Sequence, residues 1–371
     1  MASTKLQELQ QHVGQLMIVG FDGTEMSARV RTMLASIQPA GTIFFKRNVT
    51  SAEQTYKLNQ DVQSVLLTPM FRCVDLEGGT VDRLRDAIAH APSLGEVAAT
   101  GSKKIMRRFA RLLAEEARSV GFNTDFAPVF DLRTPASLKV LTSRTIAEDP
   151  HRVIDLAAEF LKGFEQEDVL GCGKHFPGLG AGAVDSHHEL PTIHKSWKAL
   201  WEEDLLPYRK LKNEMPFAMV AHCVYPEAAK DKLPASISRF WMTDILRKKI
   251  GYKGLICSDD MEMKGVQKAV PIEEATIQCI RGGADLFMVC NNESLVWRTY
   301  YAVLREAERD KPFAKQVATA SRRVLEFKRR SRAVKARMAP PPSLRTVEQL
   351  RRKIWELSEE VRLCTEVPGS C

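Results

Sequence analysis

Short apolar runs and longer amphipathic segments alternate along most of the chain. Eight runs rich in apolar and β-branched residues occur at 16–21, 41–45, 71–74, 122–127, 171–174, 218–222, 254–258 and 285–289. Segments of helical periodicity lie between them, among them 52–66, 102–120, 150–165, 197–213, 239–250 and 271–281. A repeated strand-then-helix order predicts a parallel sheet. Eight units predict a (β/α)₈ barrel of the TIM type, and no GxGxxG follows the first run to support a dinucleotide-binding sheet.

The barrel is expected to close near residue 290. Beyond that point, residues 295–307 and 313–330 have the pattern of outer helices, and Pro340, Pro341 and Pro342 mark a linker. Residues 343–362 read as one more amphipathic helix. We therefore predict a barrel domain over 1–335 and a proline-containing linker with a helical tail over 336–371.

Composition and charge narrow the class of protein. The chain has 371 residues, of which 44% are hydrophobic and 27% charged, with a formal net charge of +8. These values are typical of a soluble globular protein. The basic clusters at 322–337 and 351–353 lack interleaved aromatic residues, which favours a solvated helical surface over nucleic-acid binding. No stretch has the pattern of a secretory signal or a membrane span.

The eight cysteines form no CxxC pair, so a zinc knuckle is not expected. Five of the eight lie inside or beside apolar runs, where free cysteine behaves as a small hydrophobe. This usage favours a reducing compartment, and we predict a cytoplasmic protein.

Polar residues follow the ends of the predicted strands. Asp75 and Glu77 follow the third, Asp125 and Asp131 bracket the end of the fourth, Lys174 and His175 end the fifth, His222 ends the sixth, and Asp259 and Asp260 end the seventh. Chemistry in a (β/α)₈ barrel gathers on the loops after the carboxyl ends of the strands. The pattern therefore predicts a single active-site rim.

Two stretches carry most of the candidate chemistry. Residues 174–191 read KHFPGLGAGAVDSHHELP, in which Asp185 and His187 can hydrogen-bond so that the imidazole serves as general acid and base. Residues 256–263 read ICSDDMEM. The carboxylate of Asp259 could attack an electrophilic carbon, bind a metal, or cap the following helix.

These stretches resemble glycoside hydrolase family 3, in particular its single-domain β-N-acetylglucosaminidase branch. The likeness extends to DLEGGTVDR at 75–83, DFAPV at 125–129 and the pair Ser143 and Arg144, and it runs from about residue 15 to 289. The resemblance implies a retaining exo-β-N-acetylhexosaminidase that releases terminal N-acetylglucosamine without metal or other cofactor. In the bacterial branch the substrate is a peptidoglycan fragment, so the resemblance also implies a role in cell-wall recycling.

The resemblance also assigns roles by position. Asp259 would be the nucleophile, and His187 the acid/base with Asp185 as its partner. The first sugar would be held by Asp75, Arg83, Arg144, Lys174 and His175. The chain departs from the family where LGAG stands at 179–182 and where Thr80 replaces the usual arginine. Either change could alter which aglycone the enzyme accepts or how tightly it binds. Neither change removes a catalytic residue.

Other classes remain open from sequence. A metal-dependent barrel hydrolase would use similar residues, but it would want an HxH pair on the first strand, and residues 18–21 have none. A β-glucosidase or a phosphorolytic member of the same family, and a non-catalytic sugar-binding barrel, also share the fold. The sequence does not fix the oligomeric state.

Overall fold

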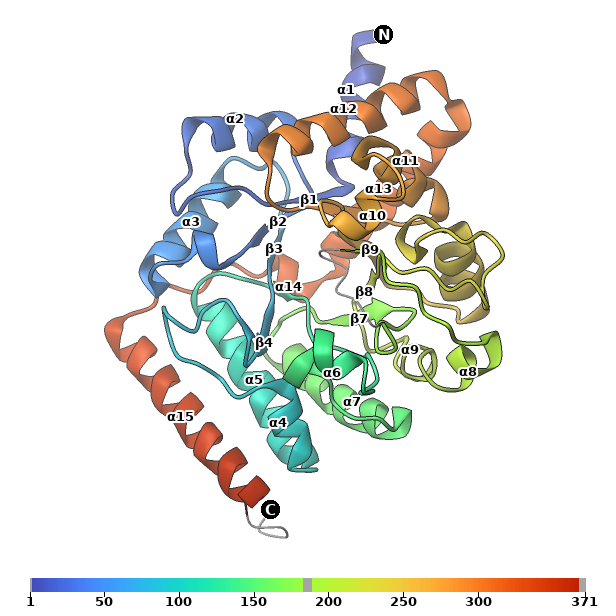
Figure 1. Cartoon of the computed structure of the whole chain (residues 1–371). Helices are drawn as coiled ribbons and strands as arrows, with labels where there is room; N and C mark the ends of the chain where they lie inside the picture. Colours follow the sequence, from blue (N-terminus) through green and yellow to red (C-terminus); the bar gives the residue numbers. More distant parts are fainter. Residues whose placement is uncertain (1, 183–188, 367–371) are drawn as a thin grey trace.

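The computed structural model describes residues 2–182 and 189–366, and its centre is a sheet of eight parallel strands (Figure 1). The strands are β1 (Met17–Val19), β2 (Gly41–Phe44), β3 (Phe71–Val74), β6 (Thr124–Asp125), β7 (Cys172–Phe176), β8 (Phe217–Val220), β9 (Leu255–Asp260) and β10 (Leu286–Val289). They run in the order β6-β3-β2-β1-β10-β9-β8-β7. Each overlaps one predicted run, so the predicted strand order is confirmed.

The two edge strands of this sheet approach each other and nearly close the barrel. Parallel bridges join Thr124 to Leu170 and Val129 to Lys174. The backbone N–H of Cys172 also donates to the carbonyl of Ala127 at 2.8 Å. The predicted (β/α)₈ architecture is therefore confirmed.

Helices surround the barrel. The longer ones are α1 (Ala2–Gly14), α2 (Ala28–Ile37), α3 (Ala52–Ser64), α5 (Lys103–Ser119), α7 (Pro150–Gln166), the π-helix η4 (Phe240–Lys249), α11 (Ile272–Gly282), α12 (Glu293–Arg309), α13 (Lys311–Arg330) and α15 (Leu344–Glu366). Shorter ones are η1 (Lys46–Asn48), α4 (Leu94–Ala99), α6 (Ser137–Val140), η2 (Thr142–Arg144), α8 (Trp197–Glu202), α9 (Leu206–Lys210), η3 (Ala235–Ile237), α10 (Lys264–Gln267) and α14 (Arg332–Lys335). Among the helices described, none combines the length and the apolar character needed to cross a bilayer.

The prediction of a single helix over 197–213 is wrong, because the structure has two short helices, α8 and α9, in its place. The break has a local cause in Pro207, which lies in the first turn of α9. Proline has no N–H to donate to the carbonyl of Glu203, and its ring would clash there in a continuous helix.

The tail predicted over 343–362 forms α15, which lies against α4 and α5 on the side of the barrel (Figure 1). Its buried residues are Leu350, Ile354, Leu357 and Val361. A spacing of four, three and four residues puts these side chains on one stripe of the helix. The domain boundary near residue 335 stays a prediction.

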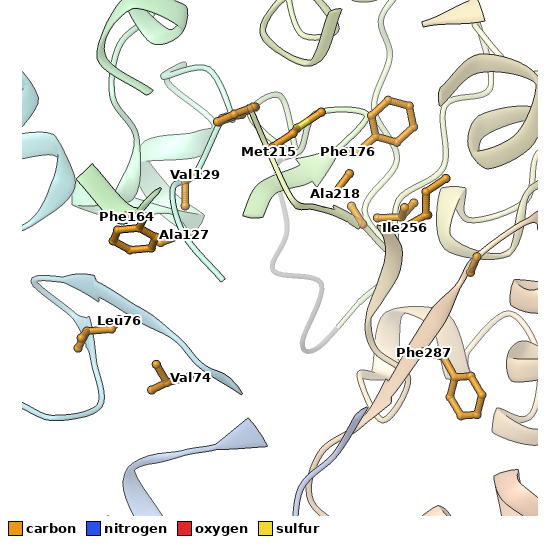
Figure 2. Close-up of a cluster of buried hydrophobic side chains, with 14 of the residues drawn as sticks. Val74, Leu76, Ala127, Val129, Phe164, Phe176, Met215, Ala218, Ile256 and Phe287 are labelled. Carbon is orange, nitrogen blue, oxygen red and sulfur yellow. The ribbon is translucent and has the colours of Figure 1, made fainter. Parts of the chain in front are cut away.

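The strands are buried on both faces. In β10, Leu286 and Met288 belong to the core inside the barrel, whereas Phe287 and Val289 belong to the layer between the strands and the helices. Figure 2 shows side chains of this outer layer, with Ala218, Ile256 and Phe287 from three strands. Period-two alternation with apolar residues on both sides is what a barrel covered by helices requires.

The amino-terminal end of the barrel interior is filled by aromatic rings and one lysine. The ring of Phe71 lies 5.1 Å from that of Phe217 and 6.0 Å from that of Phe327, measured between centroids. Lys328 is 4% exposed, and its Nζ donates to Oε1 of Gln15 at 2.9 Å. Burial lowers the pKa of Lys328 to about 7.

This lysine should make stability depend on pH. Because an unfolded lysine keeps its proton up to about pH 10.4, the depressed native pKa means that stability is lost as pH falls from 10 toward 7. We expect Lys328→Met to raise the free energy of unfolding by about 1–4 kcal/mol at pH 6 and by less at pH 9.5. Urea denaturation at both pH values measures this, with Lys315→Met on the exposed face of α13 as the control. An equal gain in the free energy of unfolding at both pH values would contradict the proposed pH dependence.

Candidate active site

A cavity of ≈ 360 Å³ opens at the carboxyl ends of the strands. Six of the predicted site residues line it, namely Asp75, Arg83, Arg144, Lys174, His175 and Asp259. They come from the ends of β3, β7 and β9, from the residue after β5 (Val81–Asp82), and from η2. The predicted acid/base pair, Asp185 and His187, lies outside the described residues. The structure therefore brings together on one rim every described residue that the sequence analysis assigned to the site.

The hairpin after β3 delivers the first of these residues. Strand β4 (Leu76–Gly78) pairs antiparallel with β5, and the chain turns between them at Gly79 and Thr80, directly after Gly78. Both glycines have positive φ, +76° and +58°, a region that other residues rarely adopt. A Cβ on Gly78 would also lie 2.1 Å from the carbonyl oxygen of Pro92. This tight turn folds the chain back so that Asp75 and Arg83 reach the same cavity.

A buried network of charges forms one wall of the cavity. Nζ of Lys174 lies 3.0 Å from Oδ1 of Asp75 and 2.5 Å from Oε1 of Glu77. Arg144 donates to both oxygens of Glu77, from Nε at 2.7 Å and from Nη2 at 2.9 Å. The side chain of Glu77 is fully buried. Glu77 therefore holds two cations at fixed positions beside the cavity.

The network determines which of its groups carry charge. Burial alone would raise the pKa of the Glu77 carboxyl, but Arg144 and Lys174 outweigh it and hold the pKa well below its usual range. Burial alone would likewise lower the pKa of Lys174, and Asp75 and Glu77 reverse the effect. Lys174 and Arg144 therefore stay protonated at neutral pH and can donate hydrogen bonds to hydroxyl groups of a ligand.

His175 is oriented by a carboxylate from the neighbouring strand end. Its Nδ1 lies 2.6 Å from Oδ2 of Asp131, which also accepts from the backbone N–H of His175 at 3.2 Å. The other oxygen, Oδ1, accepts from the backbone N–H of Leu179 at 2.6 Å. The carboxylate of Asp131 thus fixes both the imidazole and the start of the glycine-rich loop. The peptide bond between Lys174 and His175 is cis.

The two adjacent acids at the end of β9 have different surroundings. Asp260 is held by the backbone N–H groups of Glu262 and Cys290, at 3.0 and 3.2 Å, and by Nδ2 of Asn291 at 3.0 Å. Burial raises the pKa of Asp260 to about 7, against the effect of these hydrogen bonds. Asp259 lines the cavity, and its Oδ1 accepts from the backbone N–H of Asp260 at 2.8 Å. This arrangement leaves Asp260 in the wall and presents Asp259 to a ligand.

The helix-capping alternative for Asp259 is wrong. The next helix, α10, begins at Lys264 and its N-cap position is Met263. Across residues 2–182 and 189–366, no group of three or more His, Cys, Asp or Glu side chains is arranged to hold a metal ion.

Three residues that matter to the geometry had no assigned role in the sequence analysis. Glu77 and Asp131 were visible only as polar residues near strand ends, and Phe45 as the last residue of an apolar run. The ring of Phe45 lines the cavity, with the guanidinium carbon of Arg47 4.6 Å and that of Arg83 5.7 Å from its centroid. Thr80, which departs from the family pattern, also lines the cavity.

Comparisons with known proteins identify the family of this chain. Residues 8–327 match the family model described as glycosyl hydrolase family 3 N terminal domain. A β-hexosaminidase from Alkalilimnicola ehrlichii is 34% identical over 291 residues, covering 76% of this chain and 82% of the relative. One from Idiomarina loihiensis is 33% identical over 286 residues, covering 76% and 85%.

Solved structures give the same result. A glycoside hydrolase family 3 β-N-acetylglucosaminidase from Paenibacillus sp. superposes with a TM-score of 0.87 at 28% identity, covering 95% of this chain and 68% of that one. NagZ from Neisseria gonorrhoeae, in complex with N-trifluoroacetyl-D-glucosamine, gives a TM-score of 0.70 at 28% identity, covering 84% and 98%. With its barrel, its rim of charged residues and a family match over most of its length, this chain belongs to glycosyl hydrolase family 3.

Proposed function

We propose that this family 3 glycoside hydrolase is a retaining exo-β-N-acetylhexosaminidase that removes terminal β-linked N-acetylglucosamine. The single observation that carries the proposal is that Asp259, at the end of β9, lines the same cavity as the network of Lys174, Glu77 and Arg144. Lys174 and Arg144 offer charged donors to sugar hydroxyls in the same cavity that Asp259, the proposed nucleophile, lines. The β-hexosaminidase relatives support the choice of sugar.

The chemistry proceeds by two displacements at the anomeric carbon. Asp259 attacks this carbon while the glycosidic bond breaks, and His187 gives its proton to the departing oxygen. Water then attacks the same carbon, His187 takes a proton from the water, and the ester bond to Asp259 breaks. The roles of His187 and its partner Asp185 rest on their position in the family motif. The residues that hold the sugar are Asp75, Arg83, Arg144, Lys174 and His175.

The natural substrate that we propose is a peptidoglycan fragment, and the compartment is the cytoplasm. Of the seven cysteines in the described chain, six are free and buried, and this majority suits a reducing compartment. The cavity of ≈ 360 Å³ is large enough for one sugar ring, which fits release of a single terminal residue.

Substrate preference tests the proposed activity. We expect kcat/KM for 4-nitrophenyl β-N-acetylglucosaminide to exceed that for the β-glucoside by at least about 100-fold, since a site built to hydrogen-bond the acetamido group rejects an analogue without it. A chelator should leave the rate unchanged, and added phosphate should not divert the product to a sugar phosphate. A preference for the glucoside, or a rate lost with chelator, would contradict the assignment.

A further inference from the structure

We propose a second binding site at the amino-terminal end of the barrel, where Arg72, Lys335 and Arg337 bind the phosphate group of a small anion. This surface lies on the opposite side of the barrel from the catalytic cavity. The proposal is independent of the glycosidase activity, because none of these three residues lines that cavity.

Arg72 interrupts the apolar pattern of the strands. In β3, Phe71 and Cys73 belong to the core inside the barrel, and Val74 to the outer layer. Outward positions of other strands hold apolar residues such as Phe44 in β2 and Ile256 in β9. Alternation puts Arg72 in this outer layer, where a guanidinium group costs free energy unless an acceptor compensates for lost water.

The acceptors that Arg72 has within the protein are neutral. Its Nε donates to the carbonyl of Gly121 at 2.5 Å, and its Nη1 lies 3.4 Å from Oε1 of Gln63. Within the described part of the chain, no carboxylate forms an ion pair with Arg72, although the residue is only 5% exposed. Burial lowers its pKa to about 10. The buried positive charge of Arg72 has only neutral partners, so an anion bound beside it would stabilise that charge.

A cavity of ≈ 290 Å³ leads from solvent to Arg72. Lys335 and Arg337, both exposed, lie on its wall with the apolar side chains of Leu66, Leu67 and Met338. No aspartate or glutamate is among the described residues that line it. The acid of the adjoining small cavity, Asp168, is already paired with Arg332 at 2.6 Å. The larger cavity therefore has three cationic side chains and no described carboxylate of its own.

The chemistry of these groups selects the ligand. A guanidinium presents parallel N–H donors that match two oxygens of a phosphate, and a lysine adds a point charge. The apolar wall, which includes the 80% exposed Leu67, offers a surface for an organic group attached to the phosphate. Inorganic phosphate and glucose 6-phosphate share the charged part and differ only in this organic group.

Isothermal titration with these two probes, at an ionic strength held constant with chloride, tests the site. We expect one saturable site in the wild-type protein and a Kd weakened by at least about tenfold in the double variant Lys335→Ala/Arg337→Ala. Arg72→Met should abolish binding. The matched control, Lys315→Ala/Arg322→Ala, removes the same charge from exposed positions of α13 and should bind as wild type. If glucose 6-phosphate binds more tightly than inorganic phosphate, the site is assigned to an organic phosphate. If the two probes bind equally, the site is assigned to free phosphate.

Two results would overturn the proposal. One is the absence of saturable binding by the wild-type protein. The other is binding that persists in the double variant and is displaced by N-acetylglucosamine, because the phosphate would then occupy the catalytic cavity. Hydrolysis of the chromogenic substrate by the double variant should equal that of wild type, which shows that the variant is folded.

Discussion

Replacing Asp259 with asparagine is expected to lower kcat for the β-N-acetylglucosaminide by roughly 10⁴-fold, because the amide cannot attack the anomeric carbon. The fold should survive. The backbone N–H of Asp260 donates to Oδ1 of Asp259 at 2.8 Å, and an asparagine oxygen can accept the same bond. Steady-state kinetics give the loss of rate, and thermal unfolding verifies that the variant is folded.

A chemically matched control lies three residues away. Glu262 accepts from the backbone N–H groups of Asn291 and Asn292 and does not line the cavity. Glu262→Gln makes the same change from carboxylate to amide, and we expect its kcat to stay within about threefold of wild type. If Asp259→Asn kept more than about a hundredth of the wild-type rate, the assignment of the nucleophile would be wrong.

The placement of Asp259 could be predicted from the sequence because it depends on a local pattern. A run of apolar residues followed at once by acids predicts a strand end, and in a parallel barrel all strand ends of one kind share a rim. The same argument places Asp75, Lys174 and His175 correctly, although they come from segments about a hundred residues apart. The break at Pro207 is equally local, but the apolar spacing continues across it and by itself predicts one helix.

Pairing between distant residues could not be predicted in the same way. Asp131 and His175 meet because β6 and β7 lie beside each other where the barrel closes, and their separation depends on the register of those strands. Likewise, nothing in the sequence shows that Glu77 rather than Asp75 contacts both Lys174 and Arg144. The sequence gives the types of residue at the rim, and the three-dimensional arrangement gives their partners.

Glu77→Gln is the second large effect that we expect. Removing the carboxylate leaves Lys174 and Arg144 side by side with less compensation, and breaking a buried ion pair from one side costs about 3–5 kcal/mol. Because the same cations are proposed to hold the sugar, kcat/KM should also fall by about 100-fold. Chemical denaturation and steady-state kinetics measure the two losses separately. Glu326→Gln, which breaks an exposed pair with Arg330, is the control and should cost less than about 1 kcal/mol.

The pH dependence and a compensating change separate a role in stability from a role in binding. Since the pKa of Glu77 is depressed in the native state, its stabilisation is present above the unfolded pKa of about 4.3 and is lost as pH falls below it. The stability difference between wild type and Glu77→Gln should therefore shrink below pH 4. Adding Lys174→Met to Glu77→Gln removes one of the two cations that lost Glu77 as a partner, so stability should partly recover while activity stays low. Recovery of both together would mean that Lys174 does not contact the substrate, and that the network is only structural.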